Sequence, residues 1–386
     1  MESLKKKALE VHKKGPGKLA ISSLVPLETQ FDLSILYTPG VGEVSKEIAK
    51  NRNLVYDYTS KSHLVAVVSD GSAVLGLGNI GPEAALPVME GKALLFKRFA
   101  NVDAVPIVLD TQDPDEIINI VKAISPGFGG INLEDISAPR CFEIEKRLIE
   151  ELNIPVFHDD QHGTAIVVIA GLINALKLVN KTWNEVQIVI NGAGAAGIAI
   201  GNLLIEKGVK KENIVMLDSK GVIREDRSNL NEYKRLFATS RNIYTLEEAM
   251  KGADIFIGVS VKDIITPEML LSMNKNPIIF AMANPDPEIK PEIALNIRKD
   301  IIIATGRSDY PNQVNNVLAF PFIFRVALDL RLRKIDNRIK LLLSEVLAEF
   351  LGENITKDKI IPSVFDEGFS EFVIDRLKSK ILESSL

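Results

Sequence analysis

Apolar positions repeat in two alternating patterns over the first half of the chain. Continuous apolar runs at 64–69 and 104–109 are typical of buried strands, whereas residues 84–99 show helical spacing. Asp113, Pro114 and Glu116 form a helix-start signal, with the aspartate as N-cap and the glutamate completing a capping box. Strands separated by helices predict an α/β region with a parallel sheet.

Two acidic clusters follow apolar runs, at residues 129–135 and 154–160, and a helix-patterned stretch, Pro139 to Leu152, separates them. A strand, a helix and a strand of this length predict a right-handed crossover between parallel strands. If the two strands are neighbours, about 4.8 Å apart, four carboxylates meet in one small volume: Glu134, Asp135, Asp159 and Asp160. Like charges repel unless a cation joins them, and oxygen ligands favour a hard divalent cation.

The second half of the chain predicts a second sheet. Residues 163–179 are apolar on every helical face, which indicates a buried helix, and we expect it between two domains. Five nearly continuous apolar runs follow, as expected for parallel strands covered on both faces: 186–191, 213–218, 254–259, 278–282 and 301–305. Helix-start signals at Thr245 and Thr266 separate some of them. The predicted fold class is therefore α/β, with a Rossmann-type doubly wound parallel sheet and a smaller α/β domain.

A glycine motif follows the first of these strands. It reads G-x-G-x-x-G over Gly192, Ala193, Gly194, Ala195, Ala196 and Gly197. The first glycine allows the tight turn, the second lets the backbone approach a pyrophosphate, and the third lets helix and strand pack closely. Asp218, at the end of the next strand, would accept from a ribose 2′-hydroxyl and favours NAD. Because Ser219 and Lys220 could hold a phosphate, NAD and NADP both stay open.

The remaining pattern and the composition set the limits of the fold. After Pro321 the chain is helical again, and we expect residues 317–386 to join an N-terminal domain of residues 1–158, with 159–316 as the NAD(P)-binding domain. A net charge of −5 argues against nucleic-acid binding. A single cysteine, Cys141, excludes an intrachain disulfide and fits a reducing compartment. The longest apolar run is too short to span a bilayer and no leader is apparent, so we expect a cytoplasmic protein without a membrane partner.

Several motifs in this order resemble the malic enzymes in their short prokaryotic-type form. The resemblance covers nearly the whole chain, and the motifs that carry it are Leu33–Gly42, Ser69–Gly81, Pro87–Lys92, Asn132–Asp135, Phe157–Ala165, Ala283–Pro285 and Asn315–Asn316. It implies oxidative decarboxylation of (S)-malate to pyruvate and CO₂ with reduction of NAD or NADP, dependence on Mg²⁺ or Mn²⁺, and a homodimer. Decarboxylation of oxaloacetate is a further implied activity.

The resemblance also implies roles for individual residues. Tyr37 and Lys92 match the catalytic tyrosine and lysine, and Asp159 matches the acid that supports this pair. Glu134, Asp135 and Asp160 match the metal-binding carboxylates. Asn284 and Asn316 match asparagines that contact substrate and nicotinamide, and Lys92 also contacts substrate. Ala73 stands where long eukaryotic forms have an arginine that grips a substrate carboxylate, so the partner of the second malate carboxylate stays open.

The chemistry assigns two proton transfers. We expect Lys92 to take the C2 hydroxyl proton, which requires its pKa to fall toward neutrality, and Tyr37 to protonate C3 after CO₂ leaves. The reverse order is also open. Two other hypotheses remain, a metal-independent dehydrogenase and a nucleotide-binding sensor without activity. His158 and His162 flank the acids, but we interpret both as local hydrogen-bonding residues rather than zinc ligands.

Overall fold

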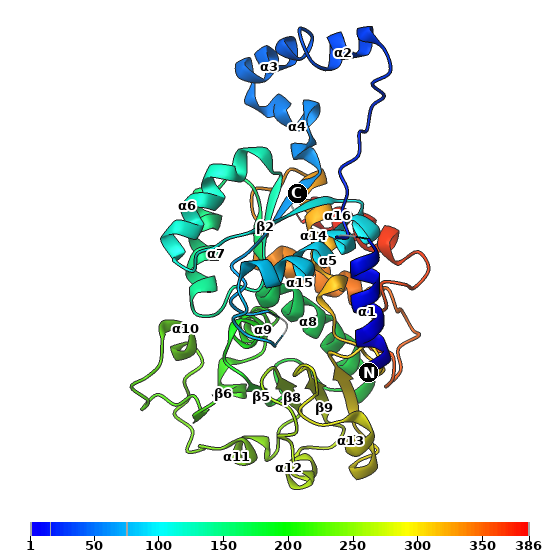
Figure 1. Ribbon diagram of the computed structural model, residues 1–386. Helices are drawn as coiled ribbons and strands as arrows, with labels where there is room; N and C mark the ends of the chain where they lie inside the picture. Colours follow the sequence, from blue (N-terminus) through cyan, green and yellow to red (C-terminus); the bar gives the residue numbers. More distant parts are fainter. Residues whose placement is uncertain (1, 16, 75, 385–386) are drawn as a thin grey trace.

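Two sheets, each covered by helices, form the body of the molecule (Figure 1). The computed structural model describes residues 2–15, 17–74 and 76–384. The first sheet is wholly parallel and has the strand order β2-β1-β3-β4. Its strands are β1 (Leu64–Ser69), β2 (Asp103–Val108), β3 (Gly130–Leu133) and β4 (Val156–His158). The helices between them are α5 (Pro82–Ala100), α6 (Pro114–Ile124) and α7 (Arg140–Glu151).

The register of this sheet brings the acidic clusters together. Strands β3 and β4 pair in parallel, with Leu133 opposite His158. Glu134 and Asp159 are therefore the first residues beyond two neighbouring strands, on the same edge of the sheet. The predicted strand–helix–strand crossover is confirmed.

The second sheet has the strand order β10-β9-β8-β5-β6-β7. Its strands are β5 (Ile188–Asn191), β6 (Ile214–Asp218), β7 (Gly221–Val222), β8 (Ile255–Gly258), β9 (Ile278–Ala281) and β10 (Ile302–Thr305). The five predicted strands are parallel, and the short β7, which the sequence did not predict, pairs antiparallel with β6. Strand order reverses between β5 and β8, as in doubly wound nucleotide-binding folds. The helices of this part are α9 (Ala195–Glu206), α10 (Glu232–Arg235), α11 (Leu246–Met250), α12 (Pro267–Ser272) and α13 (Pro291–Ile297).

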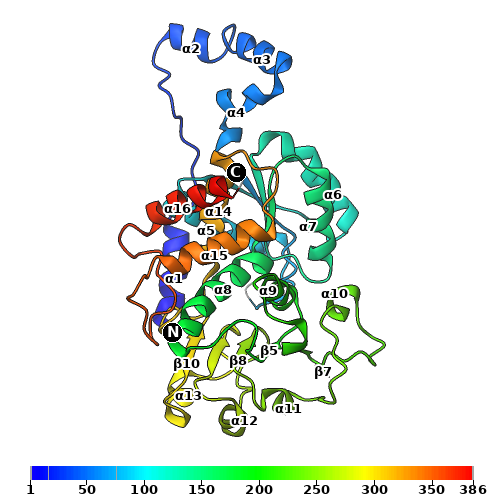
Figure 2. The same ribbon diagram turned by 180° about the vertical axis from the view of Figure 1, so that it is seen from behind.

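A long buried helix, α8 (Asp159–Val179), connects the two sheets and packs against α9 and α15 (Asn337–Glu349) (Figure 2). It begins four residues earlier than predicted, directly at the end of β4. The reason is local: His158 caps the helix, and carboxylates at Asp159 and Asp160 are favourable in a first turn where backbone N–H groups carry partial positive charge. By length and composition α8 could cross a bilayer, but here it is a core helix with most of its residues buried.

The C-terminal helices return to both parts of the body. Helix α14 (Phe320–Asp329) packs on α5, where the Phe96 ring lies 4.8 Å from Phe320 and 5.5 Å from Phe324, both edge to face. Helix α16 (Phe369–Glu383) packs on α14 and α15. The division of the chain at residues 158 and 316 stays a prediction.

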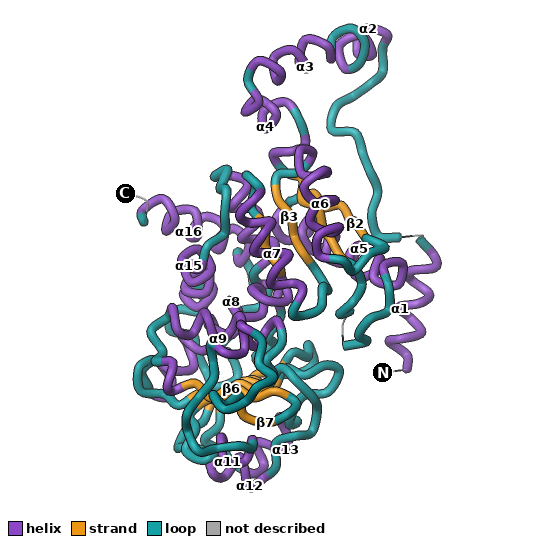
Figure 3. Tube along the Cα trace, turned by 90° about the vertical axis from the view of Figure 1, so that its left-hand side faces the viewer, coloured by secondary structure: helices purple, strands orange, loops and turns teal. Residues whose placement is uncertain are grey.

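Part of the N-terminal segment projects away from this body. It contains α1 (Glu2–Lys14), α2 (Gln30–Leu36), α3 (Val41–Lys50) and α4 (Val55–Tyr58). Residues 19–54, the N-terminal arm, carry α2 and α3 away from both sheets in each view (Figures 1 and 3). Helices α2 and α3 contain no buried residue.

One local prediction was wrong in part. Asp113 caps α6 as expected, because its side chain accepts from the backbone N–H of Glu116 at 2.9 Å. Glu116 does not complete a capping box. Its carboxylate accepts from the Thr111 hydroxyl. The hydroxyl oxygen in turn accepts from the Asp113 N–H, the donor that Glu116 would bind in a capping box.

The packing of α8 yields a stability prediction. Asn174 is fully buried, and its amide donates to the carbonyls of Ala348 and Ile360, at 3.3 and 3.0 Å. Asn174→Ala should lower the free energy of unfolding by about 1–3 kcal/mol, because it leaves buried carbonyls unpaired. Urea unfolding followed by circular dichroism measures the change. Lys177→Ala, at an exposed position of the same helix, is the control, and equal midpoints for the two variants would contradict the assignment.

Candidate functional site

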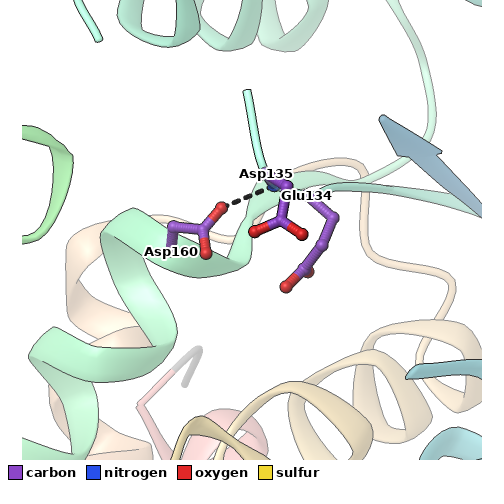
Figure 4. A group of neighbouring side chains, drawn as sticks. All are labelled: Glu134, Asp135 and Asp160. Carbon is purple, nitrogen blue, oxygen red and sulfur yellow. Dashed lines mark hydrogen bonds between the residues drawn. The ribbon is translucent and has the colours of Figure 1, made fainter. Parts of the chain in front are cut away.

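Three carboxylates converge at the edge of the first sheet (Figure 4). One oxygen from each of Glu134, Asp135 and Asp160 lies within 4.8 Å of the others. Glu134 follows β3, and Asp160 lies in the first turn of α8. Asp135 has a φ of 54°, a left-handed conformation that few residues besides Gly, Asn and Asp adopt. Its backbone N–H donates to Asp160 at 2.7 Å, so the turn after β3 is tied to the start of α8.

Lys92 lies against this cluster from the middle of α5. Its side chain is buried, and its ammonium contacts Asp159 at 2.6 Å and Glu134 at 2.9 Å. It also lies over the Phe320 ring, 4.0 Å from the centroid. The Asn316 amide donates to the same Asp159 carboxylate. Lys92, Asp159 and Asn316 are thus brought together from three elements that are distant in sequence.

The electrostatics of the cluster reflect more negative charge than one ammonium can balance. Burial and repulsion from Asp160 and Glu134 raise the pKa of Asp135 to about 9. Burial raises the pKa of Glu134 and of Asp159 to about 7, although Lys92 opposes this shift. Burial and repulsion from Asp159 raise that of Asp160 to about 6. One buried oxygen of Asp135 has no hydrogen-bond partner.

The pKa of Lys92 moves opposite to our expectation. Burial alone would lower it, but the carboxylates of Asp159 and Glu134 raise the pKa above its ordinary value. The expected fall toward neutrality is therefore not a property of this protein without a bound cation. Lys92 is held as an ammonium by the same acids that position it.

The two histidines have structural roles here. The Nδ1 of His158 accepts from the Gln161 N–H at 3.4 Å, which caps α8, and burial lowers the pKa of His158 to about 4. His162 contacts Glu145 at 2.9 Å. In the described part of the chain, the group with metal-ligand geometry contains carboxylates and no histidine.

A cleft of about 690 Å³ opens beside the glycine loop, between the two parts of the body. Its walls include Gly192, Gly194 and Asp218 on one side and Pro139 and Phe142 on the other. The sharp turn after β5 explains why glycine stands at two positions. A Cβ on Gly197 would lie 1.8 Å from the Gly192 carbonyl, and one on Gly192, whose φ is 125°, would lie 2.6 Å from the Val259 carbonyl.

The second glycine of the motif, Gly194, faces open space. A Cβ on Gly194 would meet no atom within 4 Å. Gly194 precedes α9 without any side-chain cap, so the first N–H groups of that helix are available to an anion. These features suit a dinucleotide pyrophosphate.

Asp218 is not free at the end of β6. Arg227 donates to both of its oxygens, at 3.0 and 2.9 Å, and Lys234 donates to one at 2.8 Å. Although burial alone would raise the pKa of Asp218, these cations hold it well below its usual range. Sequence reasoning missed both cations, because nothing in the spacing marks them as partners of Asp218.

Two expected site residues lie outside the cluster. Tyr37 directly follows α2 on the N-terminal arm and is 67% exposed. A single chain therefore does not bring Tyr37 to Lys92. Asn284 is exposed after β9, and its carbonyl lies near Gly76 in the loop between β1 and α5.

The structure adds polar residues that the sequence analysis did not single out. Arg140, at the start of α7, contacts the buried carboxylate of Asp70 at 3.0 Å and the Ser72 hydroxyl at 3.0 Å. Its Nε is buried without a partner. The backbone N–H of Ala73 donates to the Asp135 carbonyl, which ties this loop to the acidic cluster. Asn132 donates to Glu134 at 3.0 Å and orients it.

Comparisons with known proteins identify relatives over the whole chain. Residues 16–149 match the family model "Malic enzyme, N-terminal domain", and residues 161–367 match "Malic enzyme, NAD binding domain". The chain is 53% identical to the bifunctional malic/malolactic enzyme of Bacillus subtilis, covering 100% of this chain and 94% of that protein. It is 52% identical to the NADP-dependent malic enzyme of Escherichia coli over 95% of this chain, but spans only half of that relative.

Solved structures agree with this relationship. The malic enzyme from Pyrococcus horikoshii superposes with a TM-score of 0.94 at 47% identity, over 99% of this chain and 91% of that one. The NAD-dependent malic enzyme from Thermotoga maritima gives 0.91 at 50% identity, over 96% and 98%. Sheet order, acidic cluster, glycine loop and these similarities lead to one conclusion: the chain belongs to the malic enzyme family.

Proposed function

We propose that this chain oxidises (S)-malate to pyruvate and CO₂ while reducing NAD or NADP, in a reaction that requires Mg²⁺ or Mn²⁺. The observation that carries the proposal is the convergence of Glu134, Asp135 and Asp160 beside the buried Lys92. The names of the relatives support the reaction and leave the cofactor open, since they include NAD- and NADP-dependent malic enzymes. Oxaloacetate is a second proposed substrate, because its decarboxylation needs the same groups.

The donor set fits a hard divalent cation. All three candidate ligands are carboxylates, one of their buried oxygens lacks a partner, and burial together with repulsion from neighbouring acids raises their pKa values. Glu134, Asp135 and Asp160 would hold the ion. When bound, it would polarise the C2 oxygen of malate and stabilise the negative charge that develops as CO₂ leaves.

Lys92 is the proposed base for the C2 hydroxyl. Two carboxylates keep Lys92 protonated; neutralising one of them would make it easier for the ammonium to lose its proton, and the resulting amine could then accept the C2 hydroxyl proton. Glu134 is both a partner of Lys92 and a proposed metal ligand, so metal binding would be coupled to the loss of the Lys92 proton. Asp159 holds Lys92 and Asn316 in place, and Tyr37 is the proposed acid that protonates C3.

Arg140 is our candidate for the second malate carboxylate. Ala73 cannot bind an anion through its side chain, whereas Arg140 directly follows Ala138 and Pro139, two residues of the cleft wall, and its buried Nε has no partner. A guanidinium binds carboxylates through paired N–H groups.

Metal binding has a pH-dependent signature. Because the pKa values of Glu134 and Asp135 are raised to about 7 and 9, the folded chain retains protons that the unfolded chain has already released. The metal-free fold therefore loses stability as pH rises from 6 to about 8. Mn²⁺ replaces these protons, so it should raise the melting temperature more at pH 8 than at pH 6, as measured by differential scanning fluorimetry. Asp135→Asn should lose this response and the exposed Asp226→Asn should keep it; a wild-type melting temperature unaffected by Mn²⁺ would contradict the site.

The reaction is tested by the absorbance of reduced nicotinamide, with malate and either cofactor, with Mn²⁺ or with EDTA. Wild type should turn over only with the metal. Lys92→Ala should lower kcat by about 10²- to 10⁴-fold, the contribution of a general base. Lys97→Ala, at a surface position of the same helix, should remain near wild type. No malate-dependent signal with either cofactor would end the proposal.

Cofactor choice should depend on the cluster of Asp218, Arg227 and Lys234. In Asp218→Ser both cations lose their carboxylate partner and become available to a 2′-phosphate. The ratio of kcat/KM for NADP to that for NAD should rise about tenfold or more, which equals about 1.4 kcal/mol. Asp226→Ser removes a nearby exposed acid that pairs with Arg224 and serves as control. An unchanged ratio in Asp218→Ser would show that the 2′ position of the ribose binds elsewhere.

A further inference from the structure

We propose that a second cavity, beside the cofactor cleft, binds an organic anion through Lys340 and that this anion alters cofactor binding. The anion would carry a carboxylate or phosphate group on an apolar body. The binding site itself does not depend on the proposed reaction, whereas its effect on the cofactor rests on the proposed function.

The second cavity has a volume of about 510 Å³ and lies where four helices meet. Its walls come mainly from α7, the first turns of α8, α9 and α15, so both parts of the body contribute to it (Figure 2). The four carboxylates around Lys92 do not line it. This cavity is therefore distinct from the acidic cluster.

Lys340 is the feature that points to a ligand. It lines the cavity from α15 and is only 5% exposed. Among the residues that the structure describes, no hydrogen bond or ion pair reaches its ammonium. Burial lowers the pKa of Lys340, although Glu145 and Asp336 oppose this shift. A buried ammonium without an acceptor is unfavourable, and an anion in the cavity would supply the missing acceptor.

The two acids that act on Lys340 have other partners. One oxygen of Glu145 accepts from the His158 N–H at 2.8 Å, and the other contacts His162 at 2.9 Å. The Asp336 side chain caps α15 by accepting from a backbone N–H of its first turn at 2.9 Å. Both carboxylates are thus engaged by groups other than the Lys340 ammonium.

The rest of the lining suits the body of an organic anion. Gln161 also lines the cavity, and its Nε2 is buried without a partner, which provides a second donor. Phe142, Ile198 and Leu203 form an apolar wall. The exposed charged residues of the described lining are Lys146, Lys334, Glu150 and Glu206. Because these exposed charges balance, the buried ammonium sets the preference for an anion.

The second cavity shares a wall with the cofactor cleft. Phe142, Ile198 and Tyr233 line both spaces. The rings of Phe142 on α7 and Tyr233 on α10 have centroids 4.3 Å apart, so this pair also joins the two parts of the body. A ligand behind the pair constrains side chains that face the cofactor, and such coupling between two ligands is reciprocal.

Isothermal titration calorimetry with benzoate, phenyl phosphate and inorganic phosphate tests the site. Wild type should bind at least one of the two aromatic anions at one site per chain, more tightly than inorganic phosphate because of the apolar wall. Lys340→Met should weaken this binding by about tenfold or more, since it removes a charge-assisted hydrogen bond. Lys177→Met, at an exposed lysine of α8 outside the cavity, should bind like wild type.

Three results would overturn the anion site. They are no binding to wild type, unchanged binding in Lys340→Met, and inorganic phosphate bound as tightly as the aromatic anions, which would indicate a free inorganic anion instead.

A second variant tests the cavity without changing Lys340. Asn202 lines the cavity from α9 and is half-buried. Asn202→Phe should fill the space and abolish anion binding while circular dichroism stays unchanged. If Asn202→Phe binds the aromatic anion as tightly as wild type, the anion binds outside this cavity and the proposal is wrong.

NAD titrations measure the effect on the cofactor. With a saturating aromatic anion, the Kd for NAD should change by about twofold or more in wild type and stay constant in Lys340→Met. Competition within the cofactor cleft would persist in Lys340→Met and would contradict the proposal, as would a Kd in wild type that does not respond to the anion. A wild type that binds the anion but not NAD would contradict the proposed function instead, so the two failures are distinguishable.

Discussion

The structure depends on one electrostatic imbalance, four carboxylates gathered around a single ammonium. Lys92 contacts Asp159 and Glu134, while Asp135 and Asp160 add two further charges that it does not reach directly. Buried like charges at this separation are unfavourable without a further cation, and the raised pKa values of the acids express that cost. The divalent cation that we propose here matches this cluster in charge and donor type.

Several elements of the body position Lys92 and the four carboxylates. The parallel register of β3 and β4 sets the acids side by side, and α5 brings Lys92 to them. Phe320 at the start of α14 covers the ammonium, and Asn316 binds Asp159 from the segment before it. Helix α8 begins within the cluster and packs along α9, the helix that starts at the glycine loop. The acidic site and the cofactor cleft are therefore joined by one buried helix rather than by a flexible linker.

The N-terminal arm, unlike the body, lacks a packed environment. Helix α2 is encoded locally by a capping box, but neither α2 nor α3 has a buried residue in the single chain.

Much of this protein was predictable from its sequence because the relevant physics is local or periodic. Strand–helix alternation specified both sheets, the crossover rule placed Glu134 and Asp160 together, and the glycine spacing specified the turn after β5, where close backbone contacts exclude a side chain at Gly197. Other features arose only from tertiary packing, because they depend on which distant groups meet. The sequence could not show that Asp159 and Glu134 raise the pKa of Lys92, that Arg227 and Lys234 pair with Asp218, or that Tyr37 is exposed at the end of α2. Charges act through space, so their partners are decided by the folded chain.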